Sequence, residues 1–200
     1  MAIKFQYNKT ALQDLTKQLA IRVRALPTIK NKETALRMEV KKAKDQAALL
    51  DKKLEDKIKS YEYMARLWSE FNPELITIKD VELSVKKIAG VKTPVLDNIE
   101  FEIKEFSLVN NPDWYFDGIN VLEELATVGI ERDFFYRKMH LLDHARKKTT
   151  QKVNLYEKVQ IPGYEEAILK IKRFLEDEEN LDKSSQKIVK NRQQQAEELV

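Results

Sequence analysis

The N-terminal third of the chain carries a regular repeat of apolar residues. Between Thr10 and about Phe71 they recur at steps of three and four, or of seven where a charged residue fills the position. The repeat averages about 3.5 residues per turn, the period of a coiled coil rather than of a straight helix. Asn8 or Thr10 can cap the start, and Asn72-Pro73 is expected to end the helix. The apolar positions are Leu12, Leu15, Leu19, Leu26, Ile29, Leu36, Val40, Ala43, Ala47, Leu50, Leu54, Tyr61, Met64 and Trp68.

A helix of roughly 60 residues is about 90 Å long and needs a partner along its length. The C-terminal part of the chain repeats the same spacing and can supply that partner. Asn111-Pro112-Asp113 is typical of a helix start with proline at the first helical position. The tail after about Asp182 is polar and is expected to fray. The apolar positions here include Trp114, Ile119, Leu122, Leu125, Phe135, Leu142, Ala145, Thr149, Val153, Tyr156, Val159, Ala167, Ile171 and Phe174.

Between the two helical segments the apolar period changes from three or four to two. Val81, Leu83 and Val85 alternate with polar residues, and so do Ile99, Phe101 and Ile103, on either side of a stretch that contains Gly90, Thr93 and Pro94. Alternation of this kind predicts a pair of antiparallel strands. Because a two-stranded ribbon is marginal alone, we expect it to pack on the helices or on a partner.

The sequence therefore predicts a mainly α protein. Residues 1–72 and 113–200 are expected to form a long antiparallel two-helix coiled coil, and residues 73–112 a small middle segment with a β-ribbon, all as one structural unit. If Phe71 lies beside Pro112, Pro27 lies opposite about residue 156 on the partner helix, six residues before Pro162. Since a proline removes a helix hydrogen bond, two at nearly one level indicate either a bend or two unrelated kinks.

Composition agrees with long helices in an intracellular setting. Charged residues make up 34% of the chain, which has only four glycines and five prolines. The absence of cysteine excludes a disulfide framework and fits a reducing compartment. The chain lacks a signal-peptide core, and its apolar runs are too short for a membrane span, so we expect no direct membrane insertion.

Charge is uneven along the chain, although the net charge is only +3. Residues 1–60 hold 15 basic against 7 acidic residues, whereas residues 61–112 hold 6 against 9. The basic N-terminal face suits an acidic protein surface, phosphate or simply water. Arg146-Lys147-Lys148 with Lys152 resembles a phosphate-contacting stripe, but no aromatic stacking platform accompanies it, so nucleic-acid binding is not expected.

Few residues suggest catalysis. The four glycines are scattered, which excludes a nucleotide-binding loop, and no thiol is available as a nucleophile. His140 and His144 stand one helical turn apart, a spacing that can grip Zn²⁺ with help from Asp143 or Glu131. The position after His140 holds leucine where a metalloprotease needs glutamate. We therefore interpret both histidines as surface residues and expect no metal, no cofactor and no catalytic residue.

Two aromatic clusters lie in the C-terminal half, Trp114-Tyr115-Phe116 and Phe134-Phe135-Tyr136. They can form a small core where the ribbon meets the helices, which is the favoured interpretation. Alternatively they form an exposed docking patch for a partner.

The segment from Lys147 to Pro162 resembles the C-terminal signature of the D subunit of V/A-type rotary ATPases. The signature is a basic residue, then Val153-Asn154, Tyr156-Glu157 and, after a short gap, Ile161-Pro162. The opening segment, with Asn8-Lys9-Thr10 and Ile29-Lys30-Asn31-Lys32-Glu33, is similar to the opening helix of the same family. The resemblance is nearest to bacterial forms and covers about half of the chain. Pro27 departs from the family pattern.

The resemblance implies a non-catalytic central-stalk rotor that transmits torque between a catalytic hexamer and a membrane ion-translocating ring. Its implied partners are the catalytic head subunits A and B, the small F subunit of the stalk and the funnel-shaped C/d subunit on the membrane side. As part of that complex, the chain would be cytoplasmic and peripheral to the inner membrane. The inter-helix segment is too short for the related ATP synthase gamma subunit. A coiled-coil adaptor without a motor remains the alternative that the periodicity supports equally well.

Several polar residues are expected to contact those partners. The cations among them fall near the level of the two prolines and suit acidic loops of the head. The full set is Arg22, Arg24, Lys30, Lys32, Lys147, Lys148, Lys152, Asn154 and Glu157.

Overall fold

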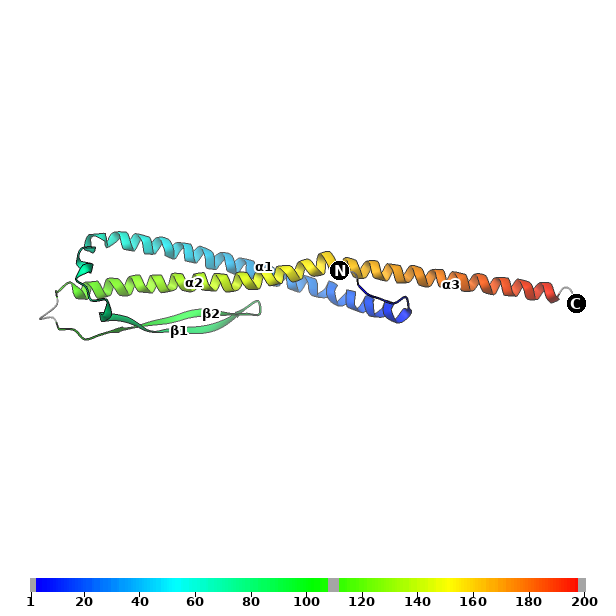
Figure 1. The fold of residues 1–200 in the computed structure, drawn as a ribbon, viewed down its shortest axis with the longest axis horizontal. Coiled ribbons are helices and arrows are strands. Elements are labelled where there is room, and N and C mark those ends of the chain that lie inside the picture. Colours follow the sequence, from blue (N-terminus) through cyan, green and yellow to red (C-terminus); the bar gives the residue numbers. More distant parts are fainter. Residues whose placement is uncertain (1–2, 108–111, 198–200) are drawn as a thin grey trace. The chain divides into compact units, whose positions relative to one another are not determined.

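A computed structural model describes residues 3–107 and 112–197 (Figure 1). The chain divides into two compact units. Unit 1 joins residues 1–31 to residues 149–200, and unit 2 comprises residues 32–148. The predicted class is confirmed: the structure is mainly helical, with long helices toward both ends and an antiparallel β-hairpin between them.

The first helix, α1, runs from Lys9 to Ser60 and contains Pro27. Asn8 caps it, since its side-chain oxygen accepts a hydrogen bond of 2.7 Å from the Ala11 amide. The expected end of this helix at Asn72-Pro73 was wrong, because α1 ends at Ser60 and three short 3₁₀ turns follow at Glu62–Met64, Leu67–Ser69 and Pro73–Leu75.

The physical reason for the earlier end is packing. The turns aim Trp68, Phe71 and Leu75 into an aromatic cluster with Tyr115, and a straight helix would spread those side chains along its axis. Asn72 caps the third turn, accepting a 3.0 Å hydrogen bond from the Glu74 amide. The apolar period alone could not distinguish these turns from another length of helix.

The C-terminal helical segment has three parts: α2 from Tyr115 to Leu155, a π-helical turn from Tyr156 to Gln160, and α3 from Ile161 to Glu197. The helix start expected at Asn111 lies partly outside the described residues. The tail expected to fray after Asp182 is helical through Glu197. Its lysines, glutamines and glutamates are good helix formers, and Glu179 pairs with Lys183 at 2.8 Å one turn later.

The β-hairpin joins β1 (Ile76–Ile88) to β2 (Val91–Ile103) through a two-residue turn at Ala89-Gly90. Both turn residues have positive φ, 49° and 84°, as a type I′ turn requires. The predicted strand pair is therefore confirmed, but Thr93 and Pro94 belong to β2 rather than to the turn. The ladder shifts register between Ile78 and Asp80 and again between Glu82 and Leu83.

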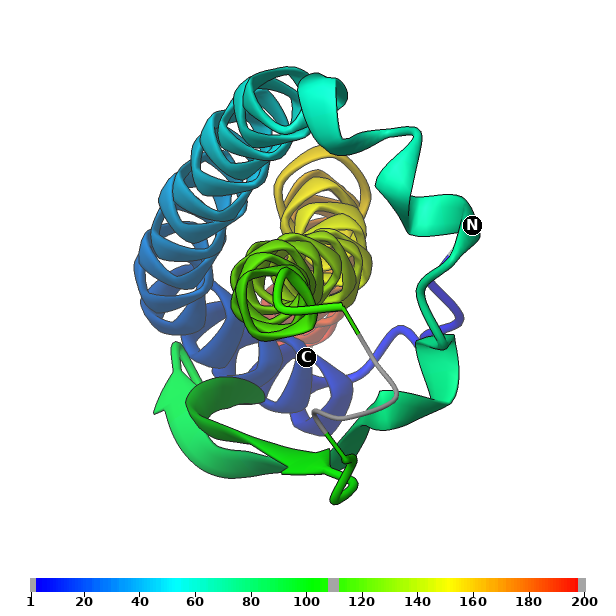
Figure 2. The same cartoon turned by 90° about the vertical axis from the view of Figure 1, so that its left-hand side faces the viewer.

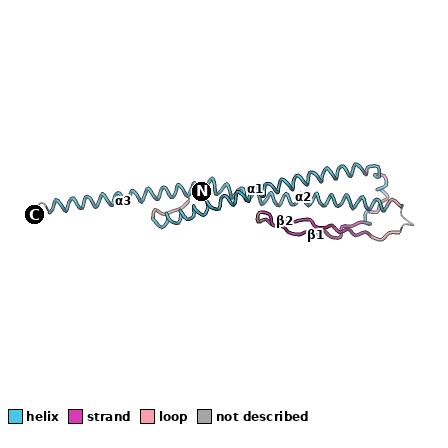
Figure 3. Tube along the Cα trace, turned by 180° about the vertical axis from the view of Figure 1, so that it is seen from behind, coloured by secondary structure: helices cyan, strands magenta, loops and turns pink. Residues whose placement is uncertain are grey.

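The hairpin runs alongside α2 within unit 2, as Figures 1 and 3 show. Phe101 of β2 lines a common groove with Asn120 and Thr127 of α2 and Lys57 of α1. Near the turn, Thr93 is fully buried and its hydroxyl donates a 2.7 Å hydrogen bond to the Lys86 carbonyl. The hairpin thus packs inward chiefly through β2, whose residues are more buried than those of β1, as a marginal two-stranded ribbon requires.

Within unit 2, α1 and α2 lie side by side (Figure 2) and run antiparallel (Figure 1). Lys57 near the end of α1 pairs with Glu124 near the start of α2, and Asp51, further back on α1, accepts a hydrogen bond from Tyr136, further along α2. Leu142 of α2 is fully buried. Near the turns, Phe71, Leu75, Tyr115 and Ile119 form a core with Trp68, Ile76, Phe106, Trp114 and Leu122 around it.

Unit 1 has its own core, where the start of α1 packs on α3. Leu15, Ala167 and Ile171 are buried there. The segment before α1 folds back onto α3, with the Tyr7 and Phe174 ring centroids 4.9 Å apart. Among the described residues, no helix is both long and apolar enough to cross a membrane.

The turn residue Ala89 offers a direct test of the hairpin. An L-residue in the left-handed region costs about 1–2 kcal/mol, and asparagine tolerates that region best after glycine. Ala89→Asn should therefore stabilise the hairpin by about 0.5–1 kcal/mol. Amide hydrogen exchange across β1 and β2 measures this; slower exchange is expected, and unchanged or faster exchange would contradict the type I′ assignment.

Candidate partner-contact site

The segment from Val153 to Pro162 contains a rare helical distortion. The Ile161 amide donates to the Tyr156 carbonyl, five residues back, which is the bond of a π-helix. Pro162 follows directly and has no N–H to donate to the carbonyl of Lys158, as an α-helix would require. Widening the turn before Pro162 accommodates this loss. In α1, by contrast, Pro27 lies within an uninterrupted helix.

Two polar contacts join the distorted segment to α1 within unit 1. The Arg22 Nε donates a 2.8 Å hydrogen bond to the Gln160 side chain, and its guanidinium lies 4.5 Å from the centroid of the Tyr164 ring. The Lys30 Nζ lies 2.7 Å from a Glu157 carboxylate oxygen. These contacts agree with the predicted pairing, which placed Pro27 opposite about residue 156. The Lys30–Glu157 ion pair is exposed and contributes at most about 1 kcal/mol, so it aligns the helices more than it stabilises them.

The nine predicted contact residues differ in whether they contact other residues of this chain. Arg22, Lys30 and Glu157 contact other residues of this chain, and Lys147 pairs with Asp143 at 3.1 Å. The Lys152 ammonium lies 5.8 Å from the Tyr156 ring centroid, and Asn154 is exposed. Arg24, Lys32 and Lys148 are exposed and form no ion pair with any described residue.

The nine residues also divide between the two units. Lys32, Lys147 and Lys148 belong to unit 2, and the other six to unit 1. A single surface that carries all nine therefore stays a prediction. What the sequence did not reveal is the π-helical turn, whose one signal was the proline at 162 within an otherwise helical pattern.

His140 and His144 are both exposed on α2. Asp143, the residue that could complete a metal site, is held by Arg146 and Lys147 at 2.8 and 3.1 Å. Hydrogen bonds from Arg146 and then from Lys147 hold the pKa of Asp143 below its ordinary value. In the described part of the chain, no group of three or more histidine, cysteine, aspartate or glutamate side chains could hold a metal ion.

The two aromatic clusters differ in their surroundings. Trp114 and Tyr115 pack against Phe71 in the core beside the 3₁₀ turns, and the Tyr115 hydroxyl donates to the Glu70 carbonyl. That part of the expected core is found. The second cluster lies elsewhere on α2, with its Tyr136 bonded to Asp51 of α1.

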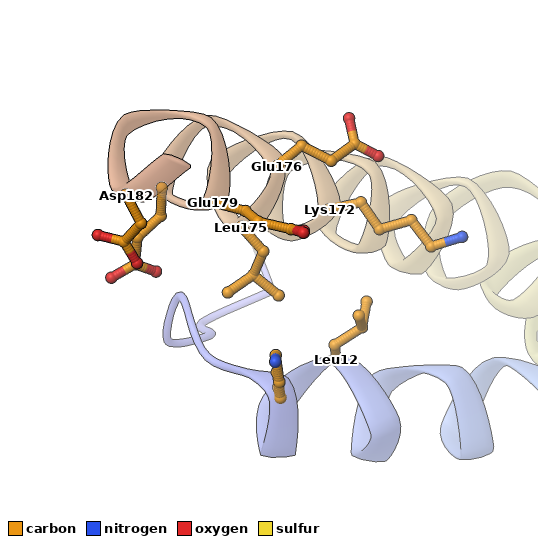
Figure 4. A pocket seen from close by; sticks show the side chains of 8 residues that line it. Leu12, Lys172, Leu175, Glu176, Glu179 and Asp182 are labelled. Carbon is orange, nitrogen blue, oxygen red and sulfur yellow. The ribbon is translucent and has the colours of Figure 1, made fainter. Parts of the chain in front are cut away.

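An open groove lies where the seam between α1 and α3 ends (Figure 4). Leu12 and Leu175 form its apolar floor, and carboxylates of Glu176, Glu179 and Asp182 line its α3 side. Beyond this groove α3 continues without a facing helix in unit 1, because α1 begins at Lys9. The groove presents charge to solvent and buries no reactive group.

The π-helical turn can be tested through Pro162. Pro162→Ala restores the missing N–H, so the turn should revert to α-helix and rotate Gln160 away from Arg22. Since the chain has no cysteine, an Arg22→Cys/Gln160→Cys pair can be cross-linked cleanly with a short bis-maleimide. Cross-linking should fall severalfold with Pro162→Ala. The matched change Pro27→Ala should leave it unaltered; equal yields in all three proteins would contradict the assigned cause.

Comparison with known proteins gives a consistent result. A sequence model of the family described as the D subunit of ATP synthase matches residues 11–191. The chain is 31% identical over 193 residues to the D subunit of the V-type ATP synthase of Borreliella burgdorferi, covering 94% of both chains. It is 29% identical over 178 residues to the protein of that name from Chlamydia muridarum, covering 86% of this chain and 88% of the relative. With the Chlamydia pneumoniae protein it shares 26% identity over 201 residues, covering 96% of this chain and 94% of the relative.

Proposed function

The chain belongs to the D-subunit family of ATP synthases, and we propose that it is the central-stalk rotor of a V/A-type rotary ATPase. In this role it transmits torque between the catalytic hexamer and the membrane ion-translocating ring. It carries no catalytic residue of its own, because nucleotide turnover takes place in the head. The name shared by its relatives supports membership of the complex, and the rotor role is the proposal.

The observation that carries the proposal is the antiparallel pairing of helices within each unit. In unit 1 a buried apolar core and the Arg22–Gln160 and Lys30–Glu157 contacts join α1 to the C-terminal helical segment. In unit 2 the Lys57–Glu124 ion pair and the Asp51–Tyr136 hydrogen bond join α1 to α2. Two helices tied at several levels resist twisting better than one helix, as a torque-bearing element requires.

The proposed partners are head subunits A and B, the small F subunit of the stalk and the membrane-side C/d funnel. We propose that the chain is peripheral to the inner membrane on its cytoplasmic side. Co-purification separates this function from that of a motor-free adaptor. A rotor should bring down the head subunits and the small stalk subunit in fixed stoichiometry, whereas an adaptor outside the ATPase should bring down neither.

The exposed cations near the prolines provide a functional test. The triple change Arg24→Ala/Lys32→Ala/Lys148→Ala removes three charges that form no ion pair among the described residues. We expect ATP-driven ion uptake into vesicles to fall severalfold relative to ATP hydrolysis, because these cations are proposed to engage acidic loops of the head. Circular dichroism of the isolated chain should be unaltered, since exposed substitutions usually change stability by less than about 0.5 kcal/mol.

The matched control removes three exposed cations elsewhere on the chain, Lys52, Lys59 and Arg66. This variant carries the same change in net charge and should keep uptake coupled to hydrolysis. Equal coupling in both triple variants would overturn the assignment of the contact residues. It would leave membership of the complex intact, which co-purification tests separately.

A further inference from the structure

The C-terminal part of α3 carries apolar side chains that the described part of unit 1 leaves uncovered. Leu181 and Ile188 are two helical turns apart on one face, and Ser185 lies between them on that face. Val189 adjoins Ile188. Leu181, Ile188 and Val189 are 69%, 54% and 55% exposed. α3 extends past the start of α1 (Figure 1), and every residue from 176 to 195 is exposed. We refer to Leu181, Ser185, Ile188 and Val189 together as the tail stripe.

The charged residues around the tail stripe are segregated by sign along the helix. Residues 176–182 hold five acidic residues and no basic residue, and we call them the acidic run. Residues 183–192 hold four basic residues and no acidic residue, and we call them the basic run. The acidic run forms the α3 wall of the open groove in Figure 4, so its carboxylates are accessible to a partner.

This segregation is unfavourable for a helix that stands alone. Glu178 and Asp182 are like charges one turn apart, and so are Lys183 and Lys187. Like charges at this spacing destabilise a helix, whereas opposite charges stabilise it. The two runs meet in an opposite-charge pair between Glu179 and Lys183, at 2.8 Å. A partner whose charges follow the reverse order would relieve the repulsion within both runs.

A second copy of the same helix, laid antiparallel, has that reverse order. Its basic run lies beside the acidic run of the first copy, and its acidic run beside the basic run. A parallel pair would instead place like charges side by side. The antiparallel register that brings Leu181 of one copy near Ile188 of the other also brings Asp182 near Lys187. The overlap is about 16 residues, or roughly 24 Å.

We propose that two copies of the free chain pair antiparallel through the tail stripe and the two charged runs. Pairing removes Leu181 and Ile188 from water and gives each charged run a neighbour of opposite sign. The contact is symmetric, because each copy offers the other the same surface. Each copy contributes only three apolar side chains, so the dimer is weak and the chain stays available for other partners. The inference goes beyond the proposed function and does not depend on it.

Charge reversal tests the pairing in the isolated full-length chain. Lys187→Glu/Lys190→Glu and Glu179→Lys/Asp182→Lys each place like charges opposite each other when the variant pairs with itself. An equimolar mixture of the two variants restores opposite charges at all of these positions. The dissociation constant, from sedimentation equilibrium, should rise by about tenfold or more for each variant alone and return to that of the unaltered chain in the mixture. Circular dichroism checks that both variants stay helical.

Single cysteines test the direction of the pairing, because the chain has no cysteine of its own. Ser185→Cys lies near the two-fold axis and should form a disulfide with its own copy under mild oxidation. Leu181→Cys should do so poorly, since its two copies are about 10 Å apart along the axis, but should link readily to Ile188→Cys in a mixture. Gln186→Cys is the control, because the helix turns this neighbour of Ser185 away from the tail stripe.

Four outcomes would overturn the inference. The first is a chain that stays monomeric throughout the concentration series. The second is a dimer that neither charge variant weakens, which would exclude the charged runs. The third is a Leu181→Cys disulfide that forms as fast as that of Ser185→Cys, which would indicate a parallel pair. The fourth is a monomeric chain whose Leu181→Cys thiol is protected only in the assembled complex, which would assign the tail stripe to another subunit. None of these results bears on the rotor role, which co-purification tests.

Discussion

Replacing Ile171 by alanine should destabilise unit 1 by about 2–5 kcal/mol. Ile171 is fully buried and belongs to the only core that joins α1 to α3 among the described residues of that unit. Its removal leaves a cavity between Leu15 and Ala167 that few neighbours can fill. Denaturant unfolding followed by amide hydrogen exchange in α3 measures the loss.

The matched control is Leu169→Ala on the same helix. Leu169 is 49% exposed, so its truncation should cost less than about 1 kcal/mol. If both substitutions destabilise unit 1 equally, the helices are not held by the core at Leu15, Ala167 and Ile171.

Replacing Gly118 by valine should destabilise unit 2 by about 3 kcal/mol. A Cβ at this position would lie 3.0 Å from a Trp114 ring carbon and 3.2 Å from a Phe71 ring carbon. The Trp114 and Phe71 rings both pack in the core beside the 3₁₀ turns, so they have little room to move. Thermal unfolding monitored by tryptophan fluorescence reports on this core, which contains Trp68 and Trp114.

Gly129 in the same helix offers an identical substitution in open space. Apart from the adjacent residues and the backbone of its own helix, nothing lies within 4 Å of a Cβ built there, and valine is a slightly better helix former than glycine. Gly129→Val should therefore be neutral or stabilising by a few tenths of a kcal/mol. Equal losses at both positions would mean that the close approach of Trp114 and Phe71 to Gly118 does not decide the outcome.

The parts of the fold that follow from local periodicity could be predicted from the sequence. The steps of three and four identified the long helices, and the alternation around Val81 and Phe101 identified the strands. The residues that lie opposite each other on the two helices could also be predicted, because two antiparallel helices joined at one end pair their residues in order of distance from the connection. The Lys30–Glu157 pair lies where this reasoning places Pro27 opposite about residue 156.

The features that could not be predicted from the sequence depend on competition between local conformational preferences and tertiary packing. The helix ends at Ser60 because Trp68 and Phe71 pack better from 3₁₀ turns. The spacing of apolar residues does not distinguish these turns from a continued helix. The tail beyond Asp182 is helical through intrinsic propensity, although it buries little. The turn at Ala89-Gly90 escaped notice because alanine seldom occupies a left-handed position.

The candidate contact site was predicted in part. Its cations could be chosen from their level along the helices, yet sequence could not show that Arg22 and Lys30 are engaged with Gln160 and Glu157 of the same chain. Nor could it show the π-helical turn, since a proline in a helical pattern is equally compatible with a kink or a break.

Rotation of a single attached probe tests the central claim most directly. Tyr63, in the turns after α1, is 78% exposed, and Tyr63→Cys supplies one thiol for a gold bead. With the catalytic head fixed to a surface and ATP added, the rotor account predicts stepwise rotation of the bead in one direction, halted when ATP is withdrawn. A bead that stays stationary or only fluctuates while the same head hydrolyses ATP would contradict the account.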